Sequence, residues 1–205
     1  MPQTSVHLIH KGGRMNGKMR TGVQAAMAIA MLLSCAGAGN APQRARAVLL
    51  NAEADTVGTV TFEEQDTGVL IVADIDGLPP GEHAFHIHEK ALCEAPDFTS
   101  AGGHFNPFGT QHGFLNDKGP HAGDLPNITV GEDSTVRVEQ RTRLITLESG
   151  AENSLFREGG TSVVIHQDPD DYITDPAGTG GARIACGAIE RVESDGRARP
   201  TQRRD

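Results

Sequence analysis

Short runs of alternating apolar and polar residues follow one another along the chain from Ala47 onward. Glycine, aspartate and proline separate these runs, and no helical period of useful length appears between them. A period of two between turn residues is typical of antiparallel β-strands. The pattern predicts an all-β domain over residues 47–193 with eight strands, at residues 47–54, 57–64, 69–75, 82–88, 134–140, 141–148, 161–166 and 183–191.

Two long segments without this alternation interrupt the predicted strands, at residues 89–127 and 167–182. Loops longer than about 12 to 15 residues with no structure of their own are uncommon inside a compact domain. We therefore expect bound metal or a covalent link to fix the first segment.

The first of these segments gathers three histidines and an aspartate among glycine, proline and asparagine residues: His104, His112, His121 and Asp124. Three imidazoles and a carboxylate form a tetrahedral set that suits zinc. The alternative is a polar surface loop that happens to be rich in histidine. The further histidines outside the segment favour the zinc site over that alternative.

Three of those further histidines lie on predicted strands. His86 and His88 are two residues apart in the strand 82–88, so their side chains share one face of it. His166 ends the strand 161–166. An all-imidazole set suits copper, which changes oxidation state where zinc cannot. One histidine shared between two metals would give copper four nitrogen ligands, and zinc three nitrogens and one oxygen.

The first 35 residues have the order of a secretory signal, with basic residues, an apolar run at residues 23–33 and small residues after it. The run is shorter than the roughly 20 residues that a membrane span needs. Leu32-Leu33-Ser34-Cys35 resembles the lipobox of bacterial lipoproteins, in which the cysteine receives a lipid anchor. The alternative is ordinary cleavage after residues 36–38. Either reading predicts export to the periplasm, as a membrane-anchored lipoprotein or as a soluble protein.

The charge balance narrows the choice of partners. The chain has 18 Lys and Arg and 27 Asp and Glu, and residues 1–35 contain four of the basic side chains and none of the acidic ones. The remaining chain therefore carries a net charge of −13. Nucleic acid is not an expected partner, because its binding calls for a basic surface. We interpret residues 36–46 as a linker and residues 194–205, with four Arg, as a disordered basic tail.

The chain contains three cysteines, and an odd cysteine in an exported protein needs an explanation. Both readings of the N-terminus remove Cys35 from the pairing of cysteines. Cys93 and Cys186 are then left as a disulfide in an oxidising compartment, or as two unrelated buried thiols.

Six motifs spread over residues 48–192 resemble those of the copper/zinc superoxide dismutases in their exported bacterial form. They follow the family's order: residues 86–88 (HIH), 103–107 (GHFNP), 112–113 (HG), 119–125 (GPHAGDL), 164–166 (VIH) and 181–187 (GARIACG). The resemblance implies a Greek-key β-sandwich or barrel of eight antiparallel strands with two long loops.

The resemblance also implies the metals and their ligands. Copper would be bound by four histidines: His86, His88, His104 and His166. Zinc would be bound by three histidines and one aspartate, with His104 shared between the metals: His104, His112, His121 and Asp124.

Other residues take implied roles around these metals. Asp170 would link one ligand of each metal, and Arg183 would receive the anion beside the copper. Cys93 and Cys186 would form the family's disulfide. The implied reaction is the dismutation of superoxide to dioxygen and hydrogen peroxide, in which His104 leaves copper and carries a proton.

The sequence departs from the family in a few places. The lysine and glutamates that guide superoxide in the animal enzymes are not recognisable between Tyr172 and Ala182. His83 matches no ligand position, and we expect it to be structural or exposed. Family members occur as monomers and as dimers, so a homodimer is one of two expected states. The alternative function is a non-catalytic copper-binding or copper-delivery module on the same fold, although such relatives usually lack copper ligands or the arginine.

Overall fold

The computed structural model describes residues 43–193. They form eight strands and one short 3-10 helix: β1 (Arg44–Asn51), β2 (Thr56–Gln65), β3 (Gly68–Asp76), β4 (Gly81–His88), η1 (Thr99–Ala101), β5 (Asp124–Val130), β6 (Thr135–Thr142), β7 (Ser162–His166) and β8 (Arg183–Val192). The predicted all-β class is confirmed. The predicted signal with Cys35, most of the predicted linker and the predicted basic tail lie outside the described residues. Within residues 43–193 no helix has the length and apolar character to span a membrane.

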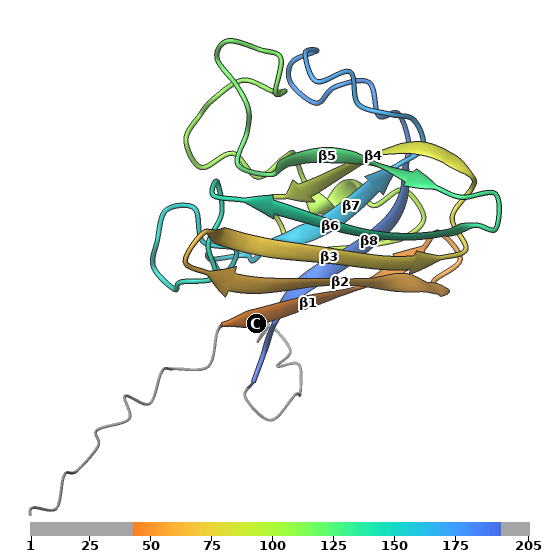
Figure 1. The fold of residues 1–205 in the computed structure, drawn as a ribbon, viewed down its shortest axis with the longest axis horizontal. Helices are drawn as coiled ribbons and strands as arrows, with labels where there is room; N and C mark the ends of the chain where they lie inside the picture. Colours follow the sequence, from red (N-terminus) through yellow and green to blue (C-terminus); the bar gives the residue numbers. More distant parts are fainter. Residues whose placement is uncertain (1–42, 194–205) are drawn as a thin grey trace, which may run out of the picture. The chain divides into compact units, whose positions relative to one another are not determined.

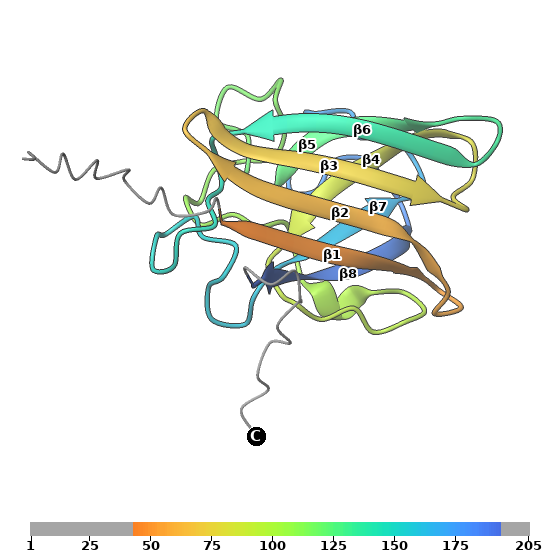
Figure 2. The ribbon, with the colours of Figure 1, turned by 60° about the horizontal axis from the view of Figure 1, so that its bottom comes forward.

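The strands pair antiparallel in the order β5-β4-β7-β8-β1-β2-β3-β6. Figures 1 and 2 show how the sheet curls, so that its two end strands, β5 and β6, come to lie side by side. The Gln140 side chain on β6 donates a hydrogen bond of 2.9 Å to the Pro126 carbonyl on β5. The result is the nearly closed barrel of eight antiparallel strands that the resemblance implies.

The core of the barrel follows from the alternation along the strands. In β1, Ala45, Ala47 and Leu49 are buried while Arg44 and Arg46 face outward. The strand begins three residues before the predicted start, because the alternation already includes the two arginines. It ends at Asn51 rather than residue 54, since the Asn51 side chain accepts hydrogen bonds from the backbone of the following turn.

One predicted strand is wrong and one strand was missed. Of the predicted strand 141–148, the first two residues are the end of β6 and residues 143–148 are not a strand; Thr146 forms an isolated bridge with Ser154. The missed strand is β5, whose sequence DLPNITV contains proline and asparagine. Proline is tolerated there because β5 is an edge strand of the ladder, where a missing N–H group breaks no pairing. Asp124 therefore stands at the first position of a strand and not in a loop.

The disulfide between Cys93 and Cys186 is confirmed. It ties the long segment after β4 to β8 across a sequence separation of 93 residues. By loop entropy, a bond that closes a loop of this length stabilises the fold by roughly 4 to 5 kcal/mol. Beside it lies a small second hydrophobic cluster: Phe98, Ala101, Val164 and Cys186, with Cys93 packed against them.

Candidate metal centre

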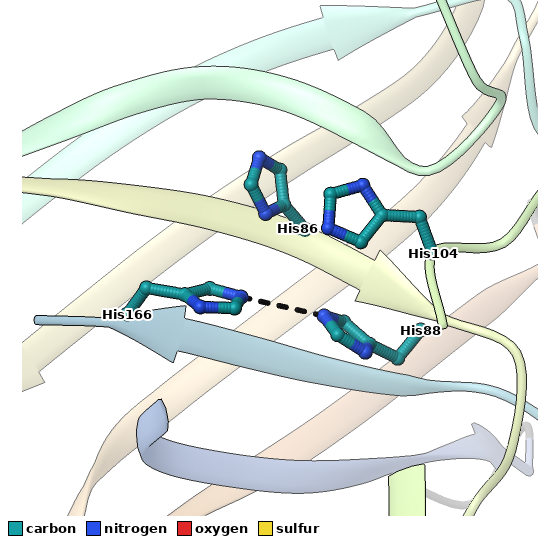
Figure 3. Close-up of side chains that lie close together, drawn as sticks. All are labelled: His86, His88, His104 and His166. Carbon is teal, nitrogen blue, oxygen red and sulfur yellow. Dashed lines mark hydrogen bonds between the residues drawn. The ribbon is translucent and has the colours of Figure 1, made fainter. Parts of the chain in front are cut away.

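Strand β4 places two histidines on one face of the barrel wall. His86 and His88 are fully or almost fully buried, and the alternating residues Phe85 and Ile87 belong to the main core. Strand β7 pairs with β4 on one side and ends at His166. Figure 3 shows the rings of these three residues and of His104 turned toward one another. The period-two expectation for His86 and His88 therefore agrees with the structure.

The four imidazoles can each offer one nitrogen to a common centre, and these nitrogens all lie within 4.8 Å of one another. We call the nitrogen that each ring offers to this centre its inner nitrogen and the other its outer nitrogen. The outer nitrogen of each ring is already used in a hydrogen bond. His88 Nδ1 donates to the Gly102 carbonyl at 3.0 Å, and His166 Nδ1 donates to the Gly181 carbonyl at 3.3 Å. The inner nitrogens of these two rings are 3.4 Å apart.

Two inner nitrogens of this cluster have no hydrogen-bond partner although they are buried: His86 Nδ1 and His104 Nε2. A buried polar atom without a partner is unusual and calls for an explanation such as an ion. A metal ion bound by all four rings would satisfy both atoms. An all-nitrogen set of imidazoles fits copper.

A second cluster surrounds the Asp124 carboxylate. Its Oδ1 lies 2.9 Å from His104 Nδ1, 3.1 Å from His112 Nδ1 and 3.4 Å from His121 Nδ1. Its Oδ2 accepts hydrogen bonds from the backbone N–H groups of Gly113 and His121, which fix its orientation. Three ring nitrogens and one carboxylate oxygen converge here, as the tetrahedral chemistry of zinc requires. His104 is the member common to both clusters.

Asp170 joins the two clusters. Its carboxylate accepts hydrogen bonds from His86 Nε2 at 3.1 Å and from His112 Nε2 at 2.9 Å. Asp170 is held in turn by Asn127, whose side chain binds both its backbone N–H and its carbonyl. A carboxylate in this position sets the orientation of one ring in each cluster.

Sequence reasoning missed two residues that shape this junction. Asn127 was placed at the end of a loop, and nothing in its local sequence indicates its contact with Asp170. Gly178 has a φ of +67°, and a Cβ there would lie 2.0 Å from Asp170 Oδ1 and 2.8 Å from His112 Nε2. The chain therefore needs glycine at this position. In the sequence, this need is indicated only by the glycine-rich stretch around Gly178.

Burial is the main reason why three rings of the first cluster titrate below the ordinary range of histidine. It lowers the pKa of His104 to about 4 and that of His166 to about 3, and the pKa of His88 also falls well below its ordinary value. These rings are uncharged at neutral pH. Each ring can therefore bind a metal through its unprotonated nitrogen, and no proton has to leave first.

The carboxylate side of the centre behaves in the opposite way. Burial alone would raise the pKa of Asp124, but the hydrogen bonds from His104 and His112 and the nearby ring of His121 bring it below its ordinary value. Burial alone would likewise lower the pKa of His112, but its hydrogen bonds to Asp124 and Asp170 raise it to about 9. His112 thus carries a proton on each ring nitrogen at neutral pH, and a metal bound to Nδ1 would displace one of them.

Arg183, the first residue of β8, lies beside the histidine cluster. Its guanidinium donates to the carbonyls of Phe98 at 2.6 Å and Gly102 at 2.7 Å. Because the Gly102 carbonyl also accepts from His88, the arginine and the cluster share one anchor. Burial lowers the pKa of Arg183 and the charge of Asp97 opposes this effect, but an arginine stays charged in proteins.

His83 is buried and structural, so the exposed alternative for it is wrong. Its Nδ1 lies 2.9 Å from the backbone carbonyl of His166, and its Nε2 lies 2.8 Å from that of Pro79. The ring therefore ties the turn before β4 to the end of β7 and belongs to none of the clusters of possible metal ligands among the described residues.

Comparison with known proteins gives one consistent family. Residues 56–189 match the model of a family described as copper/zinc superoxide dismutase. A superoxide dismutase [Cu-Zn] of Aquifex aeolicus is 53% identical over 147 residues, which are 71% of this chain and 86% of that protein. Among solved structures, a double mutant of a superoxide dismutase-like protein of Bacillus subtilis is 46% identical, with a TM-score of 0.68 over 70% of this chain and 95% of the other. The Cu/Zn superoxide dismutase of Brucella abortus is 32% identical, with a TM-score of 0.58 over 72% and 99% of the two chains.

Proposed function

Because this chain belongs to the copper/zinc superoxide dismutase family, we propose that it dismutates superoxide and that His104 is shared between its copper and its zinc. One observation carries the proposal. The Nδ1 atom of His104 is hydrogen-bonded to Asp124 in the second cluster, which leaves its unpartnered Nε2 for the four-histidine cluster. Copper would be held by His86, His88, His104 and His166, and zinc by the cluster around Asp124.

Bound copper would supply the one-electron oxidation and reduction that convert two superoxide ions and two protons into dioxygen and hydrogen peroxide. The residues of the chain supply binding and proton handling. With the proposed zinc on Nδ1 in place of a proton, His104 would hold one of the two protons on Nε2 as a neutral ring whenever copper does not occupy that atom. Asp124 keeps the ring in place through Nδ1.

Arg183 is the residue that would attract the substrate. The chain is acidic as a whole, with a net charge of −9 at pH 7, so its average field repels an anion. Arg183 places a fixed positive charge next to the His88 side of the cluster, through the shared Gly102 carbonyl. A small anion such as superoxide would therefore bind between this guanidinium and the copper.

Metal analysis of the purified protein together with a superoxide assay tests this function. We expect copper and zinc in equal amounts and rapid dismutation that is lost when a chelator removes the metals. Both metals without dismutation would contradict the proposal in favour of a copper-delivery module. Activity with copper but without zinc would contradict the shared histidine and indicate a copper-only enzyme.

We also propose that the chain is exported to the periplasm and anchored there through lipid on Cys35. The signal-like order of residues 1–35 and the lipobox-like Leu32-Leu33-Ser34-Cys35 support this. The disulfide Cys93–Cys186 adds support, because such bonds persist in oxidising compartments. Mass spectrometry of the mature N-terminus should find a lipid-modified Cys35 as the first residue. A mature chain that begins at unmodified Gly39 would rule the anchor out.

A further inference from the structure

Both acceptors of the Arg183 guanidinium belong to one short stretch of the long segment after β4. Nη1 donates to the carbonyl of Phe98 and Nη2 to that of Gly102, on either side of the helix η1. The position of the cation thus depends on how this stretch is held. The disulfide at Cys93 fixes one end of this stretch, and the isolated backbone β-bridge between His104 and His88 fixes the other.

Phe98 has an unusual backbone conformation for a bulky residue. Its φ of 53° and ψ of 24° lie in the left-handed region, which non-glycine side chains rarely adopt. Its backbone is nevertheless fully engaged. The N–H donates to the Glu94 carbonyl, and the carbonyl accepts from both Ala101 N–H and Arg183. A strained conformation of this kind persists only when its surroundings hold it in place.

The side chain of Phe98 supplies that hold. It is completely buried, and it packs in the small cluster with Ala101, Val164 and Cys186. Val164 lies on β7 and Cys186 on β8, so the ring clamps the segment onto the two strands that end in His166 and begin with Arg183. Burying a phenylalanine side chain contributes about 1.5 to 3 kcal/mol, which is enough to offset the cost of the left-handed backbone.

We propose that Phe98 is a positioning residue for anion binding, which acts through Arg183. The buried ring fixes the left-handed backbone, and the carbonyl of that residue aims the guanidinium at the space beside His88. The inference rests on the proposed role of Arg183. It predicts that Phe98 governs affinity for anions without being a metal ligand.

The test uses metal-loaded protein and azide, a small anion whose copper complex absorbs visible light. Phe98→Ala should keep its copper and zinc but bind azide about tenfold more weakly, because Arg183 loses a fixed acceptor. Phe98→Leu retains most of the apolar volume and should show a weakening of about two- to threefold. It also serves as the test if the alanine variant does not fold.

Phe62→Ala is the matched control, because Phe62 is an equally buried phenylalanine in the main core. It should lose stability without a change in azide affinity. Unchanged azide affinity in both Phe98 variants would overturn the proposal and leave Phe98 merely structural.

Arg183→Ala tests the role of Arg183 separately from that of Phe98. If this variant binds azide like the wild type, Arg183 does not bind the anion, and the positioning role of Phe98 is contradicted as well. Failure of the wild type to dismutate superoxide would contradict the proposed function alone, since azide binding needs no turnover.

Discussion

His104→Ala is expected to lower the rate of superoxide dismutation at least about 100-fold while the barrel remains folded. The ring belongs to both clusters, so its loss removes one nitrogen from each. Loss of a residue that merely supports metal ligands already costs about 10- to 100-fold in affinity or activity, and loss of a shared ligand should cost no less. The barrel should persist because His104 lies outside the strands, and its backbone pairs with β4 only through an isolated β-bridge. Rates measured per folded chain, with circular dichroism for folding, check both parts.

Asn106→Ala is the control that separates the loss of the ligand from loosening of the loop. Asn106 lies two residues beyond His104 and pins the same loop by exchanging hydrogen bonds with the Thr110 backbone. The variant should lose some stability but keep most of its activity and both metals. Full activity in the His104 variant would contradict the shared-histidine mechanism. An equal loss of activity in both variants would show that the order of the loop limits the rate, and not the histidine shared between the metals.

The fold was predictable where the hydrophobic alternation is strong. Strands β2, β3 and β4 were placed to within one residue of their ends, because clear turn residues stand at their borders and each contains buried apolar residues, which in β3 occupy every second position. The sequence failed where edge position overrides local preference. Pro126 and Asn127 indicate a loop, yet as part of an edge strand they complete the barrel. Residues 143–148 have the composition of a strand but no partner in the ladder.

The candidate site was predictable in its chemistry but not in its supports. Histidine is a strong metal ligand, so clustered histidines and the His86-Ile87-His88 pattern point to metal without any structure. The residues that hold the ligands have no such signature. Asn127 contacts Asp170 across 43 residues of sequence, and Phe98 contacts Arg183 across 85. Contacts of this kind depend on the packing of distant strands, which local patterns do not encode.

Asp124→Asn should weaken zinc binding at least about 100-fold, and it removes none of the four nitrogens of the copper cluster. The carboxylate is the only oxygen and the only anion among the proposed zinc ligands. Its Oδ2 accepts two backbone N–H groups, so an amide that keeps these bonds must turn its NH2 toward the three imidazoles. That orientation removes the oxygen ligand, and the reverse one leaves two buried N–H donors unpaired, at about 1 to 3 kcal/mol each.

The same variant should lose most of the stabilisation that zinc gives. At a zinc concentration about 1,000 times the wild-type Kd, binding adds about 4 kcal/mol to the free energy of unfolding, and a 100-fold weaker site keeps only about 1.4 kcal/mol of it. A difference of this size corresponds to a zinc-dependent shift in Tm that is about 5 to 10 °C smaller than in the wild type. Calorimetry with and without chelator measures the shift. Asp117→Asn removes the same charge from an exposed position in the loop that precedes β5 and should keep the full shift. If both variants lose it equally, the loss comes from net charge, and Asp124 is not the zinc ligand that its three imidazole contacts indicate.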